Sequence, residues 1–391
     1  MSDFSAIRPG TDLTQHAREL QLVHDAVIAG RRCAIRPRAV VARSWTRVMR
    51  AGLDPDRTNA RDPVDREDVE RRRRESPLTA VIGELAQVIK SVADASHFLM
   101  VVTDPEGVIL WREGAAATRR KADLLGFTEG AAWTEGIVGT NAIGTALVEA
   151  APVQLFSAEH FEQAQHAWYC TAHPIHDPRT GDLLGIVDVS GPALTLHPAI
   201  AALVETGVRL AESQLWRHHA ARLDRLRRSA EHIAGPLLIV DDHGWVAHSS
   251  GVATRDRIGR PRADTALAVP GLGLCLPERL AEGWIVRPAG REHRLRATLD
   301  LRSAPLLEVR GDGEPWRVPL TRRHAEILTL LHAAGPAGLS AGRLSRLLYG
   351  DDQHVVTVRA EISRLRRGVG ALVDTNPYRL AAGFALEIDE S

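Results

Sequence analysis

Histidine and cysteine side chains gather in one short stretch of the chain, where they could form a metal site. The stretch contains His160, His166, Cys170, His173 and His176. Imidazole and thiolate groups are ligands that zinc, haem iron and other transition metals accept. The spacing matches no compact zinc motif, because such motifs bring their ligands in closely spaced pairs. We therefore expect neither a metal ion nor another cofactor.

Cys170 is also a candidate for thiol chemistry. A redox-sensing thiol needs exposure and a lowered pKa, and a Cys-His hydrolase needs an activated pair; the sequence reveals neither. A buried, inert cysteine is the more common case. Cys33, Cys170 and Cys275 lie far apart, so they indicate no disulfide framework and no Cys-x-x-Cys site.

A glycine-rich segment, EGIVGTNAIGTAL at 135–147, is a second candidate site. A nucleotide-hydrolase phosphate loop ends in Gly-Lys followed by Ser or Thr, and this segment has no lysine. The dinucleotide fingerprint Gly-x-Gly-x-x-Gly is absent as well. The segment instead predicts a helix start that Thr140 or Asn141 caps, with Gly139 and Gly144 allowing close packing.

An arginine-rich helix is predicted at 355–370. Its apolar residues recur at three- and four-residue spacing and define one face: Val355, Val358, Ile362, Leu365 and Val369. The opposite face and its flank carry Thr357, Arg359, Ala360, Ser363, Arg364, Arg366 and Arg367. Guanidinium groups bond to phosphates and guanine edges, so this helix is a candidate major-groove reader. The alternative is an ordinary amphipathic helix with solvated arginines.

The surrounding pattern predicts an α+β protein of several domains. Helical spacing at 12–60 is followed by two strand-turn-strand units, one around the turn at 104–107 and one around the turn at 177–181. A long helix is predicted at 196–228, a small β-rich stretch at 231–312, and two helices before the arginine-rich one, the second capped by Ser340.

Composition and charge set outer limits on function. The 391 residues are 44% hydrophobic and 25% charged, as in ordinary globular proteins. The sequence shows no apolar run near the ~18 residues of a membrane span, and its N-terminus lacks the layout of a secretory signal. We expect a cytoplasmic protein without a membrane partner. The formal net charge is zero, so DNA binding must depend on local charge.

Two segments, WTEGIVGTNAIGTALVEAAPVQLFSAEHF and CTAHPIHDPRTGDLLGIVDVSG, resemble the GAF sensor domain of bacterial transcription activators of the acetoin-catabolism-regulator type. The earlier VVARSWTRVMRAGLDPD is similar to the helical lead-in of those regulators. The resemblance covers roughly residues 20–225. It implies an antiparallel sheet with helices and a pocket for a small organic effector.

By this resemblance the pocket residues are Trp133, Asn141, Thr145, Phe156, His160, Cys170 and His173. Each also has a structural interpretation; Trp133, for example, fits a core position. Asp188 is as consistent with a structural carboxylate at a strand end as with a ligand acceptor.

The C-terminal region resembles the winged-helix output domain of the response-regulator type. VTVRAEISRLRR and PYRL take the positions of the recognition helix and the wing entrance, and DTNPYRLA and FALEID predict a terminal hairpin that turns at 381–383. The implied DNA-contacting residues are Thr357, Arg359, Ala360, Ser363, Arg364, Arg367 and Arg379.

Together the patterns predict a helical lead-in (1–75), a GAF sensor domain with a C-terminal linker helix (76–228), a small β-rich module that is PAS-like or a spacer (229–312), and a winged-helix DNA-binding domain (313–391). Acetoin-type activators usually carry a central ATPase, but no phosphate loop follows residue 228. We therefore expect a regulator without enzymatic activity.

The expected function is that of a one-component transcriptional regulator that binds double-stranded DNA and a small organic effector. It is expected to form a homodimer through the helix at 196–228, and RNA polymerase is a further candidate partner. The alternatives are a GAF-type redox enzyme and a signalling adaptor without DNA binding.

Overall fold

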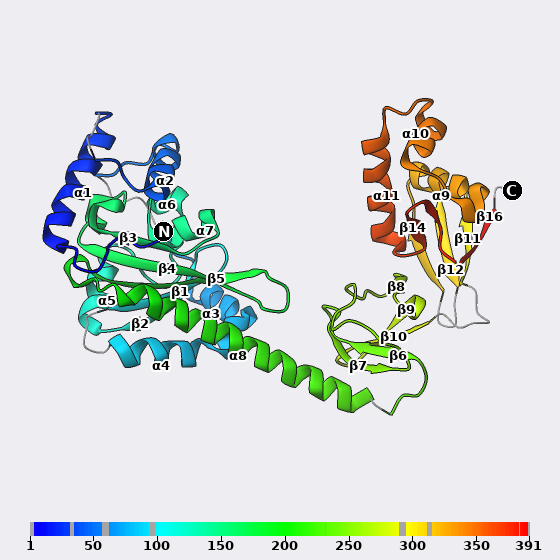
Figure 1. Cartoon of the computed structure of the whole chain (residues 1–391), viewed down its shortest axis with the longest axis horizontal. Coiled ribbons are helices and arrows are strands. Elements are labelled where there is room, and N and C mark those ends of the chain that lie inside the picture. The colour runs from blue at the N-terminus through cyan, green and yellow to red at the C-terminus, as the bar shows by residue number, and fades with distance from the viewer. Residues whose placement is uncertain are drawn as a thin grey trace. The chain divides into compact units, whose positions relative to one another are not determined.

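The structure is a computed structural model that describes residues 4–31, 35–56, 62–93, 98–230, 232–288, 295–310, 315–382 and 384–389. The chain divides into two compact units, Met1–His219 and Ala220–Ser391. Both units combine helices with antiparallel sheet, as predicted (Figure 1). Cys33 and the turn residue Gly383 lie outside the described residues.

The first unit is built on a five-stranded antiparallel sheet. Its order is β2-β1-β5-β4-β3, formed by β1 (Leu99–Thr103), β2 (Ile109–Gly114), β3 (Val153–Phe156), β4 (Trp168–His176) and β5 (Leu183–Pro192). Both predicted strand-turn-strand units are confirmed. The Asp104 carboxylate closes the first turn by accepting the backbone N–H groups of Glu106 and Val108 at 3.0 and 2.9 Å.

Helices cover both faces of this sheet because successive strand residues point to opposite sides. Met100 and Val102 of β1 pack in one core with α4 (Ile82–Ala93) and α8 (Ala199–Ala230). Leu99 and Val101 pack in the other core with α2, α5, α6 and α7, which span Ala39–Arg50, Ala116–Asp123, Glu135–Val138 and Ala142–Glu149. The remaining helices of this unit are α1 (Leu13–Ile28), α3 (Arg66–Glu75) and the short η1–η4, at Pro77–Ala80, Ser157–Glu159, Gln163–Gln165 and Ala193–Thr195.

The lead-in helices belong to the same unit as the sheet. Val41, Trp45 and Val48 of α2 are buried in the core that also holds Ile186 of β5. The Trp45 indole N–H donates to the backbone oxygen of Glu159 at 3.1 Å. Residues on both sides of position 75 therefore share one hydrophobic core.

The predicted helix start in the glycine-rich segment is confirmed. The Asn141 side-chain oxygen caps α7 by accepting the N–H of Gly144 at 2.8 Å. A Cβ atom at Gly144 would lie 2.5 Å from the backbone nitrogen of Glu135, and one at Gly139 would lie 2.8 Å from the Phe161 ring. Both glycines therefore allow the close packing that was expected.

The second unit contains two larger sheets. Antiparallel strands in the order β7-β6-β10-β9-β8 form the first, from β6 (Leu237–Val240), β7 (Val246–Ser250), β8 (Leu267–Val269), β9 (Gly273–Leu280) and β10 (Gly283–Pro288). The second has the order β13-β12-β11-β16, from β11 (Leu295–Asp300), β12 (Leu306–Arg310), β13 (Trp316–Pro319) and β16 (Phe384–Asp389). This sheet unites strands from both sides of position 312.

Three helices pack against the second sheet: α9 (Arg322–Ala334), α10 (Ala341–Tyr349) and α11 (Val355–Val369), with a short η5 (Gly335–Ala337) after α9. The Ser340 hydroxyl caps α10 by accepting the N–H of Arg343 at 3.2 Å, as predicted. Among the helices of the described ranges, none has both the length and the apolar character that crossing a bilayer requires.

The predicted terminal hairpin is wrong in its second strand. The hairpin pairs β14 (Val373–Thr375) with β15 (Tyr378–Leu380), while β16 pairs in parallel with β11. Leu386 is buried with Leu299 in the core of the unit, so the last strand gains more by completing the larger sheet. Local sequence does not show a partner this distant in the chain.

Candidate functional site

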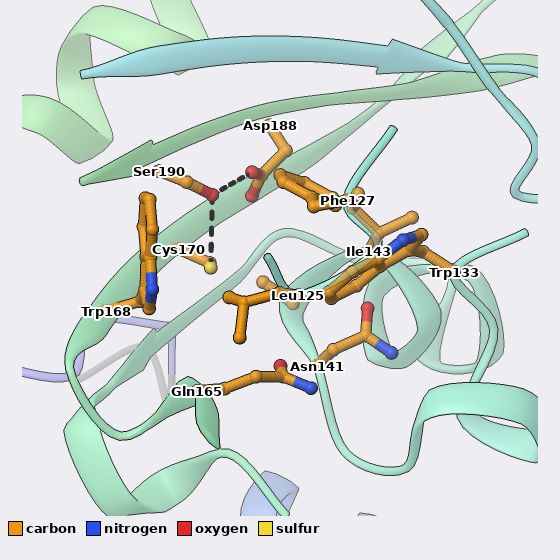
Figure 2. Close-up of a pocket in the computed structure, with 11 residues that line it drawn as sticks. Leu125, Phe127, Trp133, Asn141, Ile143, Gln165, Trp168, Cys170, Asp188 and Ser190 are labelled. Carbon is orange, nitrogen blue, oxygen red and sulfur yellow. Dashed lines mark hydrogen bonds between the residues drawn. The ribbon is translucent and has the colours of Figure 1, made fainter. Parts of the chain in front are cut away.

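A small cavity lies in the first unit (Figure 2). The walls are mostly apolar and aromatic, with a few polar groups, and comprise Leu125, Phe127, Trp133, Asn141, Ala142, Ile143, Gln165, Trp168, Cys170, Asp188 and Ser190. A bound molecule would therefore have to be small and largely apolar.

Strand alternation places the polar groups of the cavity together. Asp188 and Ser190 are two residues apart on β5, so both point to one face of the sheet. The register pairs Ser190 with Cys170 of the neighbouring β4, which adds the thiol to the same face. The start of α7 and the Phe127 and Trp133 rings, whose centroids are 4.2 Å apart, form the opposite wall.

Cys170, Ser190 and Asp188 form a short hydrogen-bonded chain. The Ser190 hydroxyl donates to Oδ2 of Asp188 at 2.5 Å, and its oxygen lies 3.1 Å from Sγ of Cys170. A hydroxyl carries a single proton, so both contacts are satisfied together when the thiol donates to Ser190, or when a protonated Asp188 donates to Ser190 and the hydroxyl donates to Sγ. Oδ1 of Asp188 is buried and has no hydrogen-bond partner among the described residues.

Burial controls the ionisation of this chain. Desolvation raises the pKa of Asp188 to about 7, although the bond from Ser190 favours the charged form. Desolvation also raises the pKa of the Cys170 thiol well above its ordinary value, and the nearby Asp188 adds to that shift. Such a thiol is mostly protonated at neutral pH, so Cys170 lacks the thiolate character that redox or hydrolytic chemistry needs.

The histidines near Cys170 do not form one cluster. His160 is buried with Nδ1 3.0 Å from the oxygen of Ser157, and burial lowers its pKa to about 4. His166 bonds to the Gln21 side chain at 2.8 Å, and His173 lies half-buried with Nδ1 2.8 Å from the oxygen of Pro174. Within the described ranges, no group of three or more His, Cys, Asp or Glu side chains is placed to hold a metal ion.

Three of the seven expected pocket residues line this cavity: Trp133, Asn141 and Cys170. The other four lie elsewhere in the unit. Phe156 points to the opposite face of the sheet and stacks on His16, with ring centroids 5.6 Å apart. Thr145 faces α2 and lies near the Ser44 hydroxyl. His160 is buried beside the backbone oxygen of Ser157, and His173 lies on β4 outside the cavity.

Sequence reasoning missed most of the cavity wall. The sequence leaves the role of Asp188 open and does not single out Ser190 or Trp168. Strand alternation in GIVDVSG and WYC could have identified them. It places Asp188, Ser190 and Trp168 on the same face of the sheet as Cys170 once the pairing of the two strands is known.

A buried polar network joins α2 to the helices beside the cavity. The Ser44 hydroxyl donates to Oε1 of Glu135 at 2.6 Å and lies 2.7 Å from the Thr140 hydroxyl. Arg47 bonds to the other Glu135 oxygen at 2.7 Å and to Glu149 at 3.0 Å. The network ties the lead-in to α6, α7 and the residue just before the Asn141 cap.

The second candidate site is the arginine surface of α11. Val358, Ile362, Leu365 and Val369 are buried, which confirms most of the predicted apolar face. Thr357, Arg359, Ser363, Arg364 and Arg367 are exposed, and Ala360 is half-buried. Arg364 pairs with Glu361 at 2.6 Å, and Arg379 of β15 pairs with Asp374 at 3.1 Å.

A groove beside α11 adds arginines from the β-rich module of the second unit. Its lining includes Arg359, Arg366 and Arg367 of α11 together with Arg260 and Arg262. The backbone N–H of Ala371 donates to the oxygen of Ala266 at 2.9 Å and joins the module to the end of α11. None of these five arginines pairs with a carboxylate in the part of the chain that the structure describes. We call this surface the arginine groove.

Comparisons with known proteins identify the relatives of the chain. Residues 11–214 match the family model described as MimR, N-terminal domain. An uncharacterised 47.3 kDa protein from the thcA 5' region of Rhodococcus erythropolis is 30% identical over 98% of this chain and 74% of its own length. The Bacillus subtilis acetoin dehydrogenase operon transcriptional activator AcoR is 30% identical over 52% of this chain and 34% of its length.

Two further comparisons extend this set. The propane 2-monooxygenase operon transcriptional activator MimR of Mycolicibacterium smegmatis is 28% identical over 46% of this chain and 31% of its own length. The crystal structure of the E. coli DhaR(N)-DhaL complex covers 64% of this chain and 99% of the matched chain, at 18% identity and a TM-score of 0.44. The chain thus spans about a third of the length of the two named activators.

Proposed function

The chain belongs to the family of the MimR N-terminal domain, a family of transcriptional regulators, and from this membership we propose that it binds double-stranded DNA as a one-component regulator. The arginine surface of α11 carries the proposal. Its guanidinium groups stand on a helix that four buried aliphatic residues anchor, which is the geometry that winged-helix reading of a major groove requires.

The first unit is the proposed GAF-type sensor, and its cavity is the proposed effector site. An effector changes DNA affinity only by binding one state of the protein more tightly than another. The network of Ser44 and Glu135 supports such a coupling, because it links the cavity helix α7 to the lead-in helix α2 through buried hydrogen bonds.

The helix α8 is the proposed dimer contact. It exposes Leu210 and Trp216, residues that are 36% and 38% accessible. Burying these side chains against a second copy would favour association. A dimer places two copies of α11 on two half-sites of DNA, which raises both affinity and selectivity.

DNA binding is tested by titrating the full chain with the DNA upstream of its own gene across a salt series. Arg364→Ala/Arg367→Ala should lose about a hundredfold or more in affinity, since each arginine contributes a strong contact to base or phosphate. Arg255→Ala/Arg296→Ala removes two exposed arginines outside the groove and should bind like the unaltered chain. Absence of selective binding at every salt concentration would refute the proposal.

A further inference from the structure

The arginine groove lies between α11 and the β-rich module, which β6–β10 form. Its lining holds five arginines, two from the module and three from α11. Four hydroxyl groups lie among them, those of Thr265, Ser363, Thr375 and Tyr378. No carboxylate lines the groove in the described part of the chain. The charge of this lining is therefore positive throughout, and the hydroxyls add donors that suit an anionic partner.

Two carboxylates on the elements beside the groove are bound to other arginines. Arg260 donates from Nε to the backbone oxygen of Asp242 at 3.1 Å, which uses one of its five guanidinium donors. The carboxylate of Asp242 pairs with Arg279 instead. Glu361 of α11 pairs with Arg364 at 2.6 Å. The positive charge of the groove is therefore available to a partner.

The module is packed against the end of α11, which keeps its arginines beside the helix. Ala266 accepts the backbone N–H of Ala371 at 2.9 Å and forms a parallel bridge with Gly370. Ala266 is also buried in the same hydrophobic core as Val369. Gly370 has a φ of +61°, and a Cβ atom there would overlap the backbone oxygen of Ala266. The module is therefore a close-packed neighbour of α11 and not a loose spacer.

The spacing of the arginines on α11 favours a chain of phosphates over a single small anion. Eight positions separate Arg359 from Arg367, which is about 12 Å at the rise of an α-helix. One strand of DNA advances about 3.4 Å per phosphate, so several phosphates fit along that length. Arg260 and Arg262 add two more cations to the same groove from the module.

We propose that the β-rich module is a second DNA-contacting element, whose Arg260 and Arg262 bind backbone phosphates beside the segment that α11 contacts. This inference rests on the proposed DNA binding of the chain and extends the contact surface beyond the helix. Phosphate contacts fix the position of a protein on DNA without reading its bases. The module therefore lengthens the DNA segment that the protein contacts, and α11 retains the selection of sequence.

Phosphate ethylation interference with the full chain tests the inference. Ethylation removes the charge of one phosphate at a time in the DNA upstream of the gene, and a phosphate whose ethylation weakens binding marks a contact. At the phosphates that the module contacts, ethylation should weaken binding severalfold in the unaltered chain and by less than about twofold in Arg260→Ala/Arg262→Ala. The other marked phosphates should persist in the variant. Arg255→Ala/Arg296→Ala, outside the groove, should retain the full set.

A second variant, Gly370→Ala, moves the module and keeps every arginine. The added methyl group displaces the module from α11, so the same phosphates should lose their effect. The matched control is Gly335→Ala. Gly335 likewise follows the last turn of a helix with a positive φ, +56°, but its Cβ atom would meet nothing within 4 Å. The control should therefore retain the full set of marked phosphates.

The outcomes separate the role of the module from DNA binding itself. An unchanged set of marked phosphates in Arg260→Ala/Arg262→Ala would overturn the inference and leave α11 as the proposed DNA-binding element. A uniform loss of affinity, with every mark retained, would also overturn it, because it would show a general effect of charge. If the unaltered chain marks no phosphate at any salt concentration, the proposed DNA binding is refuted as well.

Discussion

The cavity of the first unit and the arginine groove of the second unit present opposite surfaces to their proposed partners. The cavity encloses a single carboxyl among aromatic and aliphatic side chains, and burial brings the pKa of that carboxyl to about 7. The groove exposes five guanidinium groups that no carboxylate neutralises in the described ranges. The cavity therefore suits recognition by shape, whereas the groove suits recognition by charge.

A pH titration acts on the cavity and leaves the arginines unchanged. The folded pKa of Asp188 is about 7 and the unfolded value is near 3.9, so the folded state retains a proton that the unfolded state releases. The contribution of Asp188 to the unfolding free energy should fall as pH rises from about 4 to 7, by up to about 4 kcal/mol, and then level off. Urea titrations of the unaltered chain and of Asp188→Asn across that pH range isolate this contribution, because the variant lacks the carboxyl. The buried His160 and His166, whose pKa values are lowered to about 4 chiefly by burial, change the total in the opposite direction in both proteins. Parallel pH profiles of the two proteins would contradict a raised pKa for Asp188.

Salt acts on the groove and leaves the cavity unchanged. Five arginine–phosphate contacts predict that DNA affinity falls by several hundredfold, on the order of 10²–10³, between 50 and 200 mM salt. Fluorescence anisotropy measures this affinity. A shallow salt dependence of DNA binding would show that the groove is not the contact surface.

The variant Arg260→Ala/Arg262→Ala tests whether the β-rich module contributes to DNA binding separately from α11. Losing two phosphate contacts should weaken DNA binding by about 30-fold and lower the salt slope by about 2, without changing which DNA sequence is preferred. The matched control is Arg255→Ala/Arg296→Ala, which removes the same charge outside the groove. Unchanged affinity in the Arg260/Arg262 variant would restrict the interface to α11 and the hairpin.

Ser44→Ala tests the network beside the cavity. The change removes a donor from buried Glu135 and should lower the unfolding free energy of the first unit by about 1–2 kcal/mol. Thr46→Ala on the same helix removes an exposed hydroxyl that bonds only within α2, and it should cost less than about 0.5 kcal/mol. Urea unfolding monitored by tryptophan fluorescence distinguishes the two. Equal effects would show that the network contributes nothing specific.

Local rules account for what the sequence predicted well. The Asn141 cap, the Asp104 turn and the buried face of α11 each depend on residues a few positions apart, so spacing alone identifies them. Helix caps, turns and apolar helix faces follow the same local rules in all proteins, so a single sequence is enough to predict them.

The parts that could not be predicted depend on distant neighbours. Asp188 and Cys170 meet because β4 and β5 pair in one particular register, and β16 leaves the hairpin because β11 offers a better partner. The histidines separate because each finds its own backbone or side-chain acceptor. The division of the second unit at position 312 ignored a sheet that forms across it.

The burial of α2 in the core of the sensor sheet has a consequence for how such sensors are inherited. Val41, Trp45 and Val48 would face water if a recombination junction fell near residue 76, and the sheet would lose one wall of its core. A junction just before Asp12, the cap of α1, keeps these contacts together. The family match begins at residue 11. Recombination that keeps this core intact therefore has to transfer the lead-in helices and the sheet together.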